Sequence, residues 1–390
     1  MPIAPQKLHL DRNLHILFGV TLIVVMGVSS IAPAFPPIME AFGLTATKVA
    51  WLVTAFTLPG VFLTPVFGIL ADRHGRKKVL VPALVCFGIF GAACTLADSF
   101  AMLVGLRFLQ GVGAASLGAL NMTIISDLYS GNQRTQALGY NAGMLSLGTT
   151  LFPLLGGILA QFGWRWPFLL PLLALPLALA VLIRLQCPEP DRDVDFMEYM
   201  RLALKRASGS RALALFATTA VTFIILYGVL ISFLPVYLAE TFDAEPWAIG
   251  MIFASTSLAT AIMSTQLGRL ARVVPPSGLL VAAFVLYAVS AVLIPLMPSL
   301  WWVLLPIMIF GVAQGLNIPC VQTLLADLAP MEQRGAFMAL NGTVLRVGQT
   351  LGPVVMGTSY AVAGYWGVFI TGAVLALSVC VLVLLTLREG

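Results

Sequence analysis

The stretch Gly68–Leu80, GILADRHGRKKVL, holds five charged residues among its 13, in a chain of 390 residues of which only 9% are charged. Small residues precede the acidic Asp72, and basic residues lie on both sides of Gly75. A basic cluster between long apolar runs is typical of a short loop at a membrane surface, because Lys and Arg are retained on the cytoplasmic side. The stretch therefore predicts a membrane protein with a connecting loop here.

Composition and apolar runs support this interpretation. Hydrophobic residues make up 59% of the chain, whereas soluble domains contain roughly 45 to 50%. An apolar helix of about 20 residues crosses a hydrocarbon core, and a first run this long is expected to be retained rather than cleaved as a signal peptide. The sequence predicts twelve such helices, at residues 15–37, 49–71, 79–97, 101–126, 136–160, 166–186, 212–238, 248–269, 277–296, 300–326, 335–361 and 365–386.

The twelve runs fall into two groups of six, which predicts an all-α membrane fold of two pseudo-symmetric six-helix bundles. We expect the bundles at residues 1–186 and 212–390, joined by a cytoplasmic linker at 187–211. The linker is rich in charge, and either an amphipathic interfacial helix or a flexible solvated segment fits it. A gapless shift of 200 residues gives 15 identities over residues 111–170, among them Asn141 with Asn341. Such internal duplication is common in transporters.

The distribution of Lys and Arg predicts the orientation. If the N-terminus is cytoplasmic, the even-numbered loops carry thirteen basic residues and the odd-numbered loops carry two, Lys48 and Arg165. This bias predicts a multi-pass protein of the plasma (inner) membrane with both termini in the cytoplasm. The net charge of +5 is then a consequence of topology, so no nucleic-acid partner is indicated. A monomer in the lipid bilayer is expected.

Three motifs resemble signatures of the major facilitator superfamily, and within it of the 12-helix drug:proton antiporters. The opening stretch resembles the family's loop signature through Gly68, Leu70, Ala71, Asp72, Arg73, Gly75, Arg76, Lys77 and Leu80. The segment LVGLRFLQGVGAA resembles the helix-4 signature through Arg107, Gln110, Gly111 and Gly113. The segment GTTLFPLLGG resembles the helix-5 antiporter signature, although Phe152 stands where Gly is usual, and its copy GQTLGPVVMG has Gly352 there.

The resemblance implies a secondary transporter, not an enzyme, that exports a small amphipathic organic compound in exchange for protons by alternating access. It implies a conformational latch at Gly68, Asp72, Arg73, Gly75 and Arg76, which closes the cytoplasmic side when Asp72 meets the start of helix 11. Proton coupling is expected to involve Arg107 and Asp127. Hinges are expected at the prolines and glycines of helices 5 and 11, because Pro frees a backbone carbonyl and Gly permits close packing: Pro153, Gly156, Gly157, Gly352 and Pro353.

Two arginines, Arg107 and Arg346, fall inside predicted spans, where a charge is costly and functional by default. Neither has an obvious acidic partner in the sequence, which favours a neutral or anionic substrate over a cationic one. Arg346 is either a structural residue or a substrate contact. Substrate-binding candidates are Arg346, Asn141, Asn341, Gln314, Asn317, Tyr227, Phe35 and Gln110, with Asn141 and Asn341 as the best polar pair.

Other chemistry has little support in the sequence. The five cysteines lack metal-site spacing and are expected to be reduced, and three scattered histidines suggest neither a metal site nor a triad. No cofactor is expected. The remaining alternatives are a facilitator or symporter on the same fold, a lipid flippase, and a membrane receptor that binds without transport.

Overall fold

The computed structural model describes residues 8, 11–187, 209–328 and 334–387, together with the side chains of these residues except 334–336. Helices are the only regular secondary structure in these ranges. The interfacial helix considered for the linker falls in residues 188–208 and lies outside the described residues.

Six apolar spans form the first bundle. The first span bends where α1 (Arg12–Ser29) passes through η2 (Ala32–Ala34) into α2 (Phe35–Phe42), and Pro occupies the first turn of each of the latter two elements. The remaining spans are α3 (Ala46–Val49) with α4 (Trp51–His74), α5 (Arg76–Ala93) with η3 (Cys94–Leu96), α6 (Phe100–Leu128), α7 (Gly131–Gln161), and η4 (Trp166–Leu173) with α8 (Ala174–Arg184).

The second bundle repeats this order. Its elements are α10 (Ser210–Ile225) with η5 (Leu226–Phe233) and α11 (Leu234–Phe242), α12 (Pro246–Leu270), α13 (Pro276–Leu293) with η6 (Ile294–Leu296), η7 (Leu300–Val303) with α14 (Leu304–Leu328), and α15 (Arg334–Thr386). Eleven described helices are long and apolar enough to cross a membrane, and the last contributes 50 residues. It bends at Ala363 and Gly364, whose backbones are not helical. Its two arms supply the eleventh and twelfth spans, so the predicted fold is confirmed.

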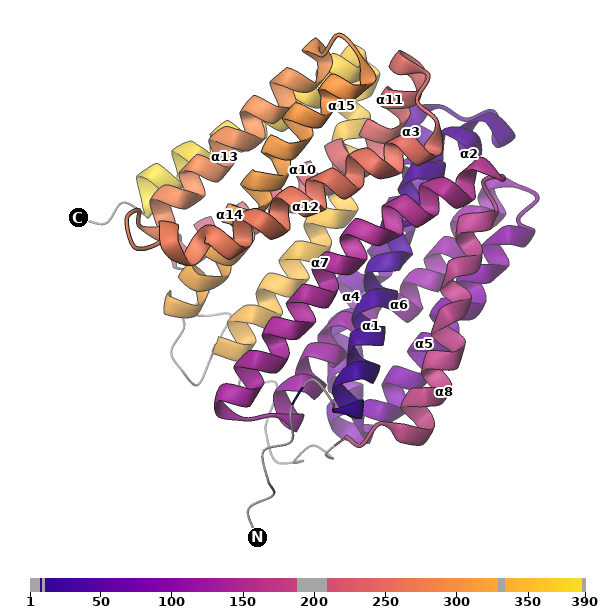
Figure 1. Ribbon diagram of the computed structural model, residues 1–390, viewed down its shortest axis with the longest axis vertical. Coiled ribbons are helices and arrows are strands. Elements are labelled where there is room, and N and C mark those ends of the chain that lie inside the picture. Colours follow the sequence, from indigo (N-terminus) through magenta and orange to yellow (C-terminus); the bar gives the residue numbers. More distant parts are fainter. Residues whose placement is uncertain (1–7, 9–10, 188–208, 329–333, 388–390) are drawn as a thin grey trace.

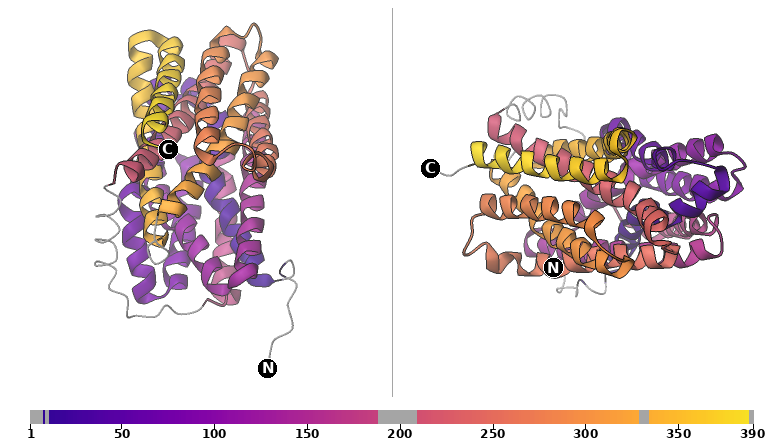
Figure 2. Two further views of the ribbon diagram at one scale, coloured as in Figure 1. Left: turned by 90° about the vertical axis from the view of Figure 1, so that its left-hand side faces the viewer. Right: turned by 90° about the horizontal axis from the view of Figure 1, so that it is seen from above.

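The two bundles meet at one side of the molecule and diverge at the other. In Figure 1, α7 and α12 run side by side at the upper right and separate toward the lower left, on the side where α1 begins and α15 ends. We call these the opposite side and the termini side. Figure 2 shows from two further directions that the second bundle, salmon to yellow, lies beside the first.

Glycines set the close packing inside each bundle. A Cβ on Gly113 of α6 would lie 2.5 Å from the Phe87 backbone nitrogen of α5, and one on Gly111 would overlap the Phe56 carbonyl of α4. The equivalent Gly311 of α14 meets the Thr256 carbonyl of α12 in the same way. Small residues permit such backbone contact between helices in lipid, where apolar side chains alone provide little drive for association. The duplicated sequence therefore builds two bundles with the same helix contacts.

The seventh span contains a π-helical segment, η5, between α10 and α11. Such wide turns are rare and are frequent at functional sites. The Ser232 hydroxyl donates a hydrogen bond to the Tyr227 carbonyl at 2.7 Å, which satisfies a backbone acceptor within the wide turn. A Cβ on Gly228 would lie 2.6 Å from the Gly352 carbonyl oxygen of α15. The π-helical segment therefore packs directly on the predicted hinge of helix 11.

Candidate functional site: the seams between the bundles and the residues beside them

In the first contact between the bundles, here called the α7–α12 seam, glycines allow the backbones of the two helices to touch directly. A Cβ on Gly250 of α12 would lie 2.5 Å from the Pro153 carbonyl oxygen of α7, and a Cβ on Gly157 would overlap the Pro246 carbonyl oxygen. The Ser257 hydroxyl donates to the Thr149 carbonyl at 2.9 Å further along the same seam. The predicted hinge residues Pro153 and Gly157 therefore lie at a contact between bundles.

The second contact, the α4–α15 seam, is a threonine cluster. The Thr54 hydroxyl donates to the Thr350 carbonyl at 3.3 Å, and the Thr350 hydroxyl donates to the Thr57 hydroxyl at 3.0 Å. Both threonines of α4 belong to its first two turns, on the opposite side of the molecule. Among the described residues, these two seams thus join the bundles on the opposite side.

Two other predicted hinge glycines make contacts within their own bundle. A Cβ on Gly156 would overlap the Ser30 carbonyl of the first span, and a Cβ on Gly352 would lie 2.8 Å from the Gly228 backbone nitrogen. Phe152, the departure from the antiporter signature, is buried in the apolar core of the first bundle. Adjacent glycines of α7 therefore have different roles. Gly156 packs against the first span of its own bundle, whereas Gly157 packs against α12 of the second bundle.

Arg107 is enclosed by the first bundle and is 1% exposed. Its guanidinium donates to the Gly27 carbonyl at 2.9 Å, to the Leu52 carbonyl at 3.4 Å and to the Gln110 amide oxygen at 2.6 Å. Its Cζ also lies 4.2 Å from the centroid of the Phe56 ring, within range of a cation–π interaction. These contacts tie α6 to the first span and to α4. Gln110, predicted to bind substrate, is fully buried and accepts a hydrogen bond from Arg107.

Arg346 of α15 lies in a different environment. It is partly exposed, and its guanidinium donates one hydrogen bond among the described residues, to the Gln349 amide oxygen at 3.1 Å. Its aliphatic stem lies over Gly60 of α4, where an added Cβ would come within 3.2 Å of the Arg346 Cδ. Tyr227 lies next to both Arg346 and Gln349. Arg346 therefore sits at the α4–α15 seam with most of its five donors uncommitted.

Each residue of the predicted asparagine pair makes a hydrogen bond within its own bundle. Asn141 accepts a hydrogen bond from the Thr21 hydroxyl in the first bundle, and Asn341 accepts one from the Thr219 hydroxyl, at 2.7 Å, in the second. Both asparagines are buried. Each amide thus joins two helices of its own bundle, where a buried polar group needs a partner.

The remaining substrate-binding candidates divide by accessibility. Phe35 is 1% exposed and belongs to the apolar core. Asn317 is equally buried and donates to the Thr222 hydroxyl at 2.7 Å, while Gln314 is partly exposed and accepts from the Tyr287 hydroxyl at 3.4 Å. Of the eight predicted residues, the structure leaves three partly exposed: Arg346, Gln314 and Tyr227.

A small cavity of about 40 Å³ lies beside this group in the second bundle. Phe223, Asn317, Asn341 and Leu345 contribute to its lining. This volume accommodates a few water molecules or one functional group, because a single water needs about 10 to 15 Å³ by this measure. It does not hold an organic molecule.

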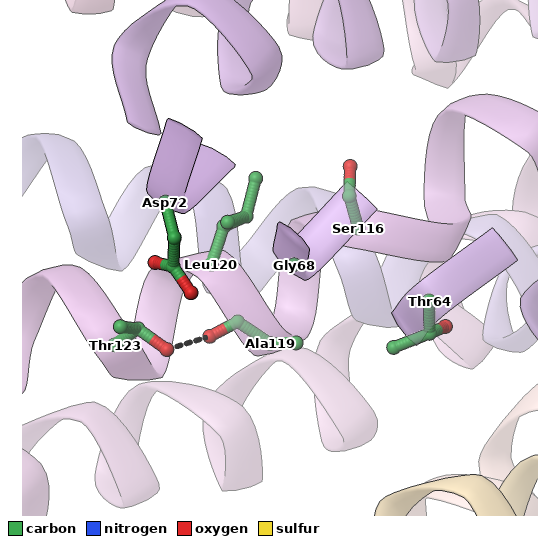
Figure 3. A pocket seen from close by; sticks show the side chains of 7 residues that line it. All are labelled: Thr64, Gly68, Asp72, Ser116, Ala119, Leu120 and Thr123. Atoms are coloured by element: carbon green, nitrogen blue, oxygen red, sulfur yellow. Dashed lines mark hydrogen bonds between the residues drawn. The ribbon is translucent and has the colours of Figure 1, made fainter. Parts of the chain in front are cut away.

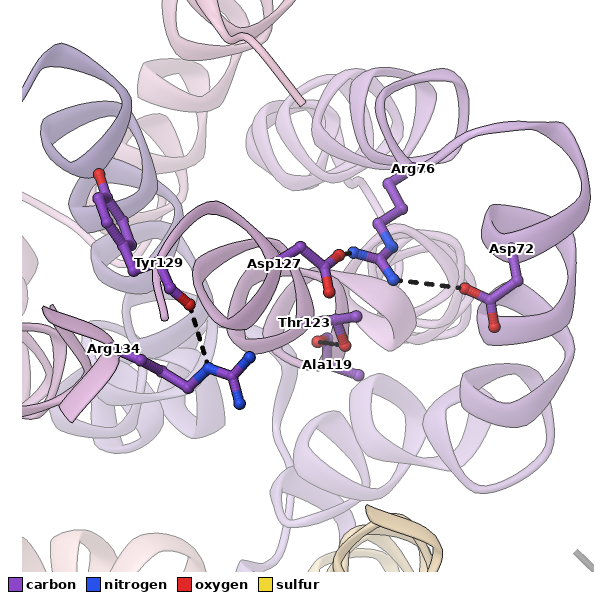
Figure 4. A network of polar contacts seen from close by, with 7 residues as sticks. All are labelled: Asp72, Arg76, Ala119, Thr123, Asp127, Tyr129 and Arg134. Carbon is purple, nitrogen blue, oxygen red and sulfur yellow. Dashed lines mark hydrogen bonds and ion pairs between the residues drawn. The ribbon is translucent and has the colours of Figure 1, made fainter. Parts of the chain in front are cut away.

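The predicted latch forms a charged network at the termini side, as Figure 4 shows. Arg76 forms an ion pair with Asp127 at the end of α6 and lies 3.8 Å from the Asp72 carboxylate. Gly75 connects α4 to α5 with φ of 98°, a conformation that side chains rarely adopt. Arg73 is exposed. The loop is therefore bound to its own bundle through Arg76.

Asp72 and Gly68 line a second cavity, of about 80 Å³, between α4 and α6. Figure 3 shows the Asp72 carboxylate beside Thr123 at one end of this cavity, and Ser116 and Thr64 toward the other end. A Cβ added to Gly68 would meet no atom within 4 Å. The expected partner of Asp72, the start of helix 11, adjoins residues 329–333, which lie outside the described residues.

A clasp near the N-terminus fixes the next loop at the termini side. The Tyr129 hydroxyl donates to the Asp11 carboxylate at 2.7 Å, and the Arg134 guanidinium donates to the Tyr129 carbonyl at 3.1 Å. Burial and the neighbouring Asp11 carboxylate raise the pKa of Tyr129 above its usual value. The first span is thus tied to the loop between α6 and α7.

The sequence interpretation missed Gly60, Thr54 and Thr57, all in α4. Three polar or small residues at spacings of three in an otherwise apolar span share one helical face. This pattern could have indicated a contact with another helix. Among the described residues, no three His, Cys, Asp or Glu side chains are placed to hold a metal ion.

The twelve-span, two-bundle architecture defines a class of multi-pass membrane transporters. The model of the Major Facilitator Superfamily matches residues 17–272 and 215–390. The chain belongs to that superfamily and is a transporter, not an enzyme.

Similar proteins include the bacillibactin exporter of Bacillus subtilis (strain 168), 27% identical over 96% of both chains. Multidrug resistance protein 1 of the same organism is 26% identical over 88% of this chain and 89% of its own. Among solved structures, the nucleoside transporter NupG matches with a TM-score of 0.82 at 10% identity, over 97% of this chain and 100% of its own. A bacterial homologue of the lysosomal transporter Spinster, in an inward-facing and unoccupied conformation, matches with a TM-score of 0.74 at 18% identity, over 96% and 94%.

Proposed function

We propose that this protein exports a small amphipathic organic compound, neutral or anionic, across the plasma membrane in exchange for protons. Support for export comes from full-length similarity to proteins named as a bacillibactin exporter and a multidrug resistance protein. Support for the substrate's charge comes from Arg346, which is partly exposed beside the seam and lies in no ion pair of the described residues. A positive charge at this depth disfavours cationic compounds.

Transport follows an alternating-access cycle in this proposal. With both termini in the cytoplasm, the described conformation faces inward, because both seams join the bundles on the opposite side. The observation that carries this step is the direct backbone contact between the bundles at Gly157 and Gly250. The seams part in the outward-facing state, and the Gly68–Arg76 loop then acts as the latch that closes the cytoplasmic side. One chain contains both bundles, which supports a monomer as the working unit.

Proton coupling is assigned to the termini side. Asp127 forms an ion pair with Arg76 there. Protonation of Asp127 would break this ion pair, and Arg76 could then pair with the nearby Asp72 carboxylate in place of Asp127. Arg107 acts by holding three spans together around the pathway. One proton moving down 100 mV provides about 2.3 kcal/mol, and one pH unit provides about 1.4 kcal/mol. Together they support a gradient of a few hundred-fold, which is sufficient for export.

The test is proton movement in proteoliposomes with an acidic interior and a trapped pH dye. Anionic, neutral and cationic amphiphiles are added in turn to wild type and to Asp127→Asn. The proposal expects proton release with an anionic or neutral compound and its loss in the variant. Equilibration of a labelled compound without proton release would instead indicate a facilitator. No movement of any compound would contradict transport of this class.

A further inference from the structure

The two seams are related by the internal duplication, yet they differ at one pair of positions. The shift of 200 residues places Ser146 opposite Arg346 and Thr260 opposite Gly60. In the α4–α15 seam the long Arg346 side chain lies over a glycine. The equivalent positions of α7 and α12 hold Ser146 and Thr260, and the Thr260 hydroxyl donates to the Gly311 carbonyl of α14 at 2.9 Å. Where one copy has the larger Arg346 in place of Ser146, it has the smaller Gly60 in place of Thr260. Gly60 therefore provides the space that the Arg346 side chain occupies.

Arg346 also differs from Arg107, the other intramembrane arginine, in its hydrogen bonds and its exposure. Arg107 has three hydrogen bonds and an aromatic face and is 1% exposed. Arg346 has a single hydrogen bond among the described residues and is partly exposed. A guanidinium carries five N–H donors in a planar fork that matches an oxyanion with two oxygens. Arg107 donates three hydrogen bonds to protein groups, whereas Arg346 donates one and so keeps more of its fork available for such a ligand.

An apolar wall lies next to this charge. Tyr227 lies beside Arg346 and Gln349, and its ring lies 6.2 Å from that of Phe223, centroid to centroid. Both aromatic residues come from the seventh span, and Tyr227 lies in its π-helical segment. The group therefore combines a guanidinium, an amide and two aromatic rings, which suits a molecule with one charged and one apolar end.

From these observations we infer that Arg346 binds the oxyanion of the transported compound, and that the substrate class is amphipathic organic anions bearing a carboxylate or a similar group. This inference rests on the proposed function, since it assigns the substrate of the same pathway. Gly60 is a positioning residue, because it acts through the Arg346 stem. Gln349 orients the guanidinium through its amide oxygen.

The test measures binding of naphthoate and naphthamide by calorimetry, with the protein in lipid nanodiscs. The two probes differ in charge and share an aromatic body. Wild type is expected to bind naphthoate more tightly by about tenfold or more, the range of a charge-assisted hydrogen bond. Arg346→Gln removes this preference, and Arg346→Lys retains part of it, because it keeps the charge without the fork. Ser146→Ala is the matched control at the duplicated position and keeps the full preference.

A further variant separates folding from binding. Gly60→Thr with Arg346→Ser installs in α4 and α15 the residue types that occupy the duplicated positions of α12 and α7. The double variant is therefore expected to fold and to lose the preference for naphthoate. Equal binding of both probes by wild type would overturn the inference, as would a preference that survives in Arg346→Gln.

Transport measurements keep this inference distinct from the proposed function. If wild type moves naphthamide and naphthoate alike, export stands and the anion site is overturned. If wild type binds naphthoate through Arg346 yet moves neither compound, the anion site stands and the proposed export fails.

Discussion

The substitution Gly250→Ala should shift the protein away from the conformation described here. The added Cβ would lie 2.5 Å from the Pro153 carbonyl oxygen, whereas real Cβ contacts essentially never fall below 3.0 Å. The α7–α12 seam must therefore open by about 0.5 Å, and both partners are backbone that cannot rotate away. Overpacking of this kind costs about 1 to 3 kcal/mol, which corresponds to a change of about 5- to 150-fold in a two-state population.

The contact exists only while the bundles are joined on the opposite side, so the cost falls on that conformation alone. Gly157→Ala should have the same effect, because its Cβ would overlap the Pro246 carbonyl across the same seam. The double variant should be less than additive, since an opened seam no longer opposes the second methyl group. Gly156→Ala meets Ser30 of its own bundle and should reduce stability without favouring the parted state.

The assay is electron–electron distance measurement between spin labels at Asp98 and Val362, in a background without native cysteines. Both positions are highly exposed on the opposite side, one in each bundle. Gly250→Ala should increase the population with the longer distance. Gly268→Ala, on the same helix with no atom within 4 Å of its added Cβ, should not. An unchanged distribution in folded Gly250→Ala, or an equal shift in Gly268→Ala, would refute the reasoning.

Three further predictions follow from single contacts. Thr350→Val removes the hydrogen bond to Thr57 and should favour the parted state by about 0.5 to 1.5 kcal/mol, as read by the same spin-label pair. Arg107→Gln leaves two buried carbonyls without their donor and should lower stability by about 1 to 3 kcal/mol; thermal unfolding that matches wild type would contradict this role. Tyr129→Phe should lower the melting temperature at pH 7, where the bond to Asp11 is intact. Because the folded-state pKa of Tyr129 is raised, this stabilisation is complete below the unfolded value of about 10 and is lost as pH rises through the folded pKa, so melting curves of variant and wild type should converge in strong alkali.

The architecture could be predicted from the sequence because membrane spans carry a one-dimensional signal. Length, apolar content and the duplication at a shift of 200 residues locate the helices without knowledge of their contacts. The glycines could also be predicted to lie at close contacts. Which neighbour each one meets could not, because adjacent positions such as Gly156 and Gly157 face different helices. A turn of 100° per residue separates a contact within a bundle from a contact between bundles.

The site was less predictable, because the partners of polar residues come from other helices. Asn141 and Asn341 are equivalent in sequence and were predicted as the best polar pair for substrate binding, and each accepts a hydrogen bond from a threonine of its own bundle. Arg107 and Arg346 looked alike as charges inside spans. Only the three-dimensional arrangement shows that carbonyls of two neighbouring spans surround the first and that Gly60 leaves space for the second.

The central claim is that one pathway beside Arg346 opens to the two sides of the membrane in turn. The most direct test is labelling of Leu345→Cys, next to Arg346 and partly exposed, with an impermeant maleimide applied from either side of oriented vesicles. We predict labelling from the termini side in the otherwise unmodified protein, and labelling from the opposite side once Gly250→Ala is added. Labelling from the same side in both proteins, at unchanged rates, would contradict alternating access through this pathway.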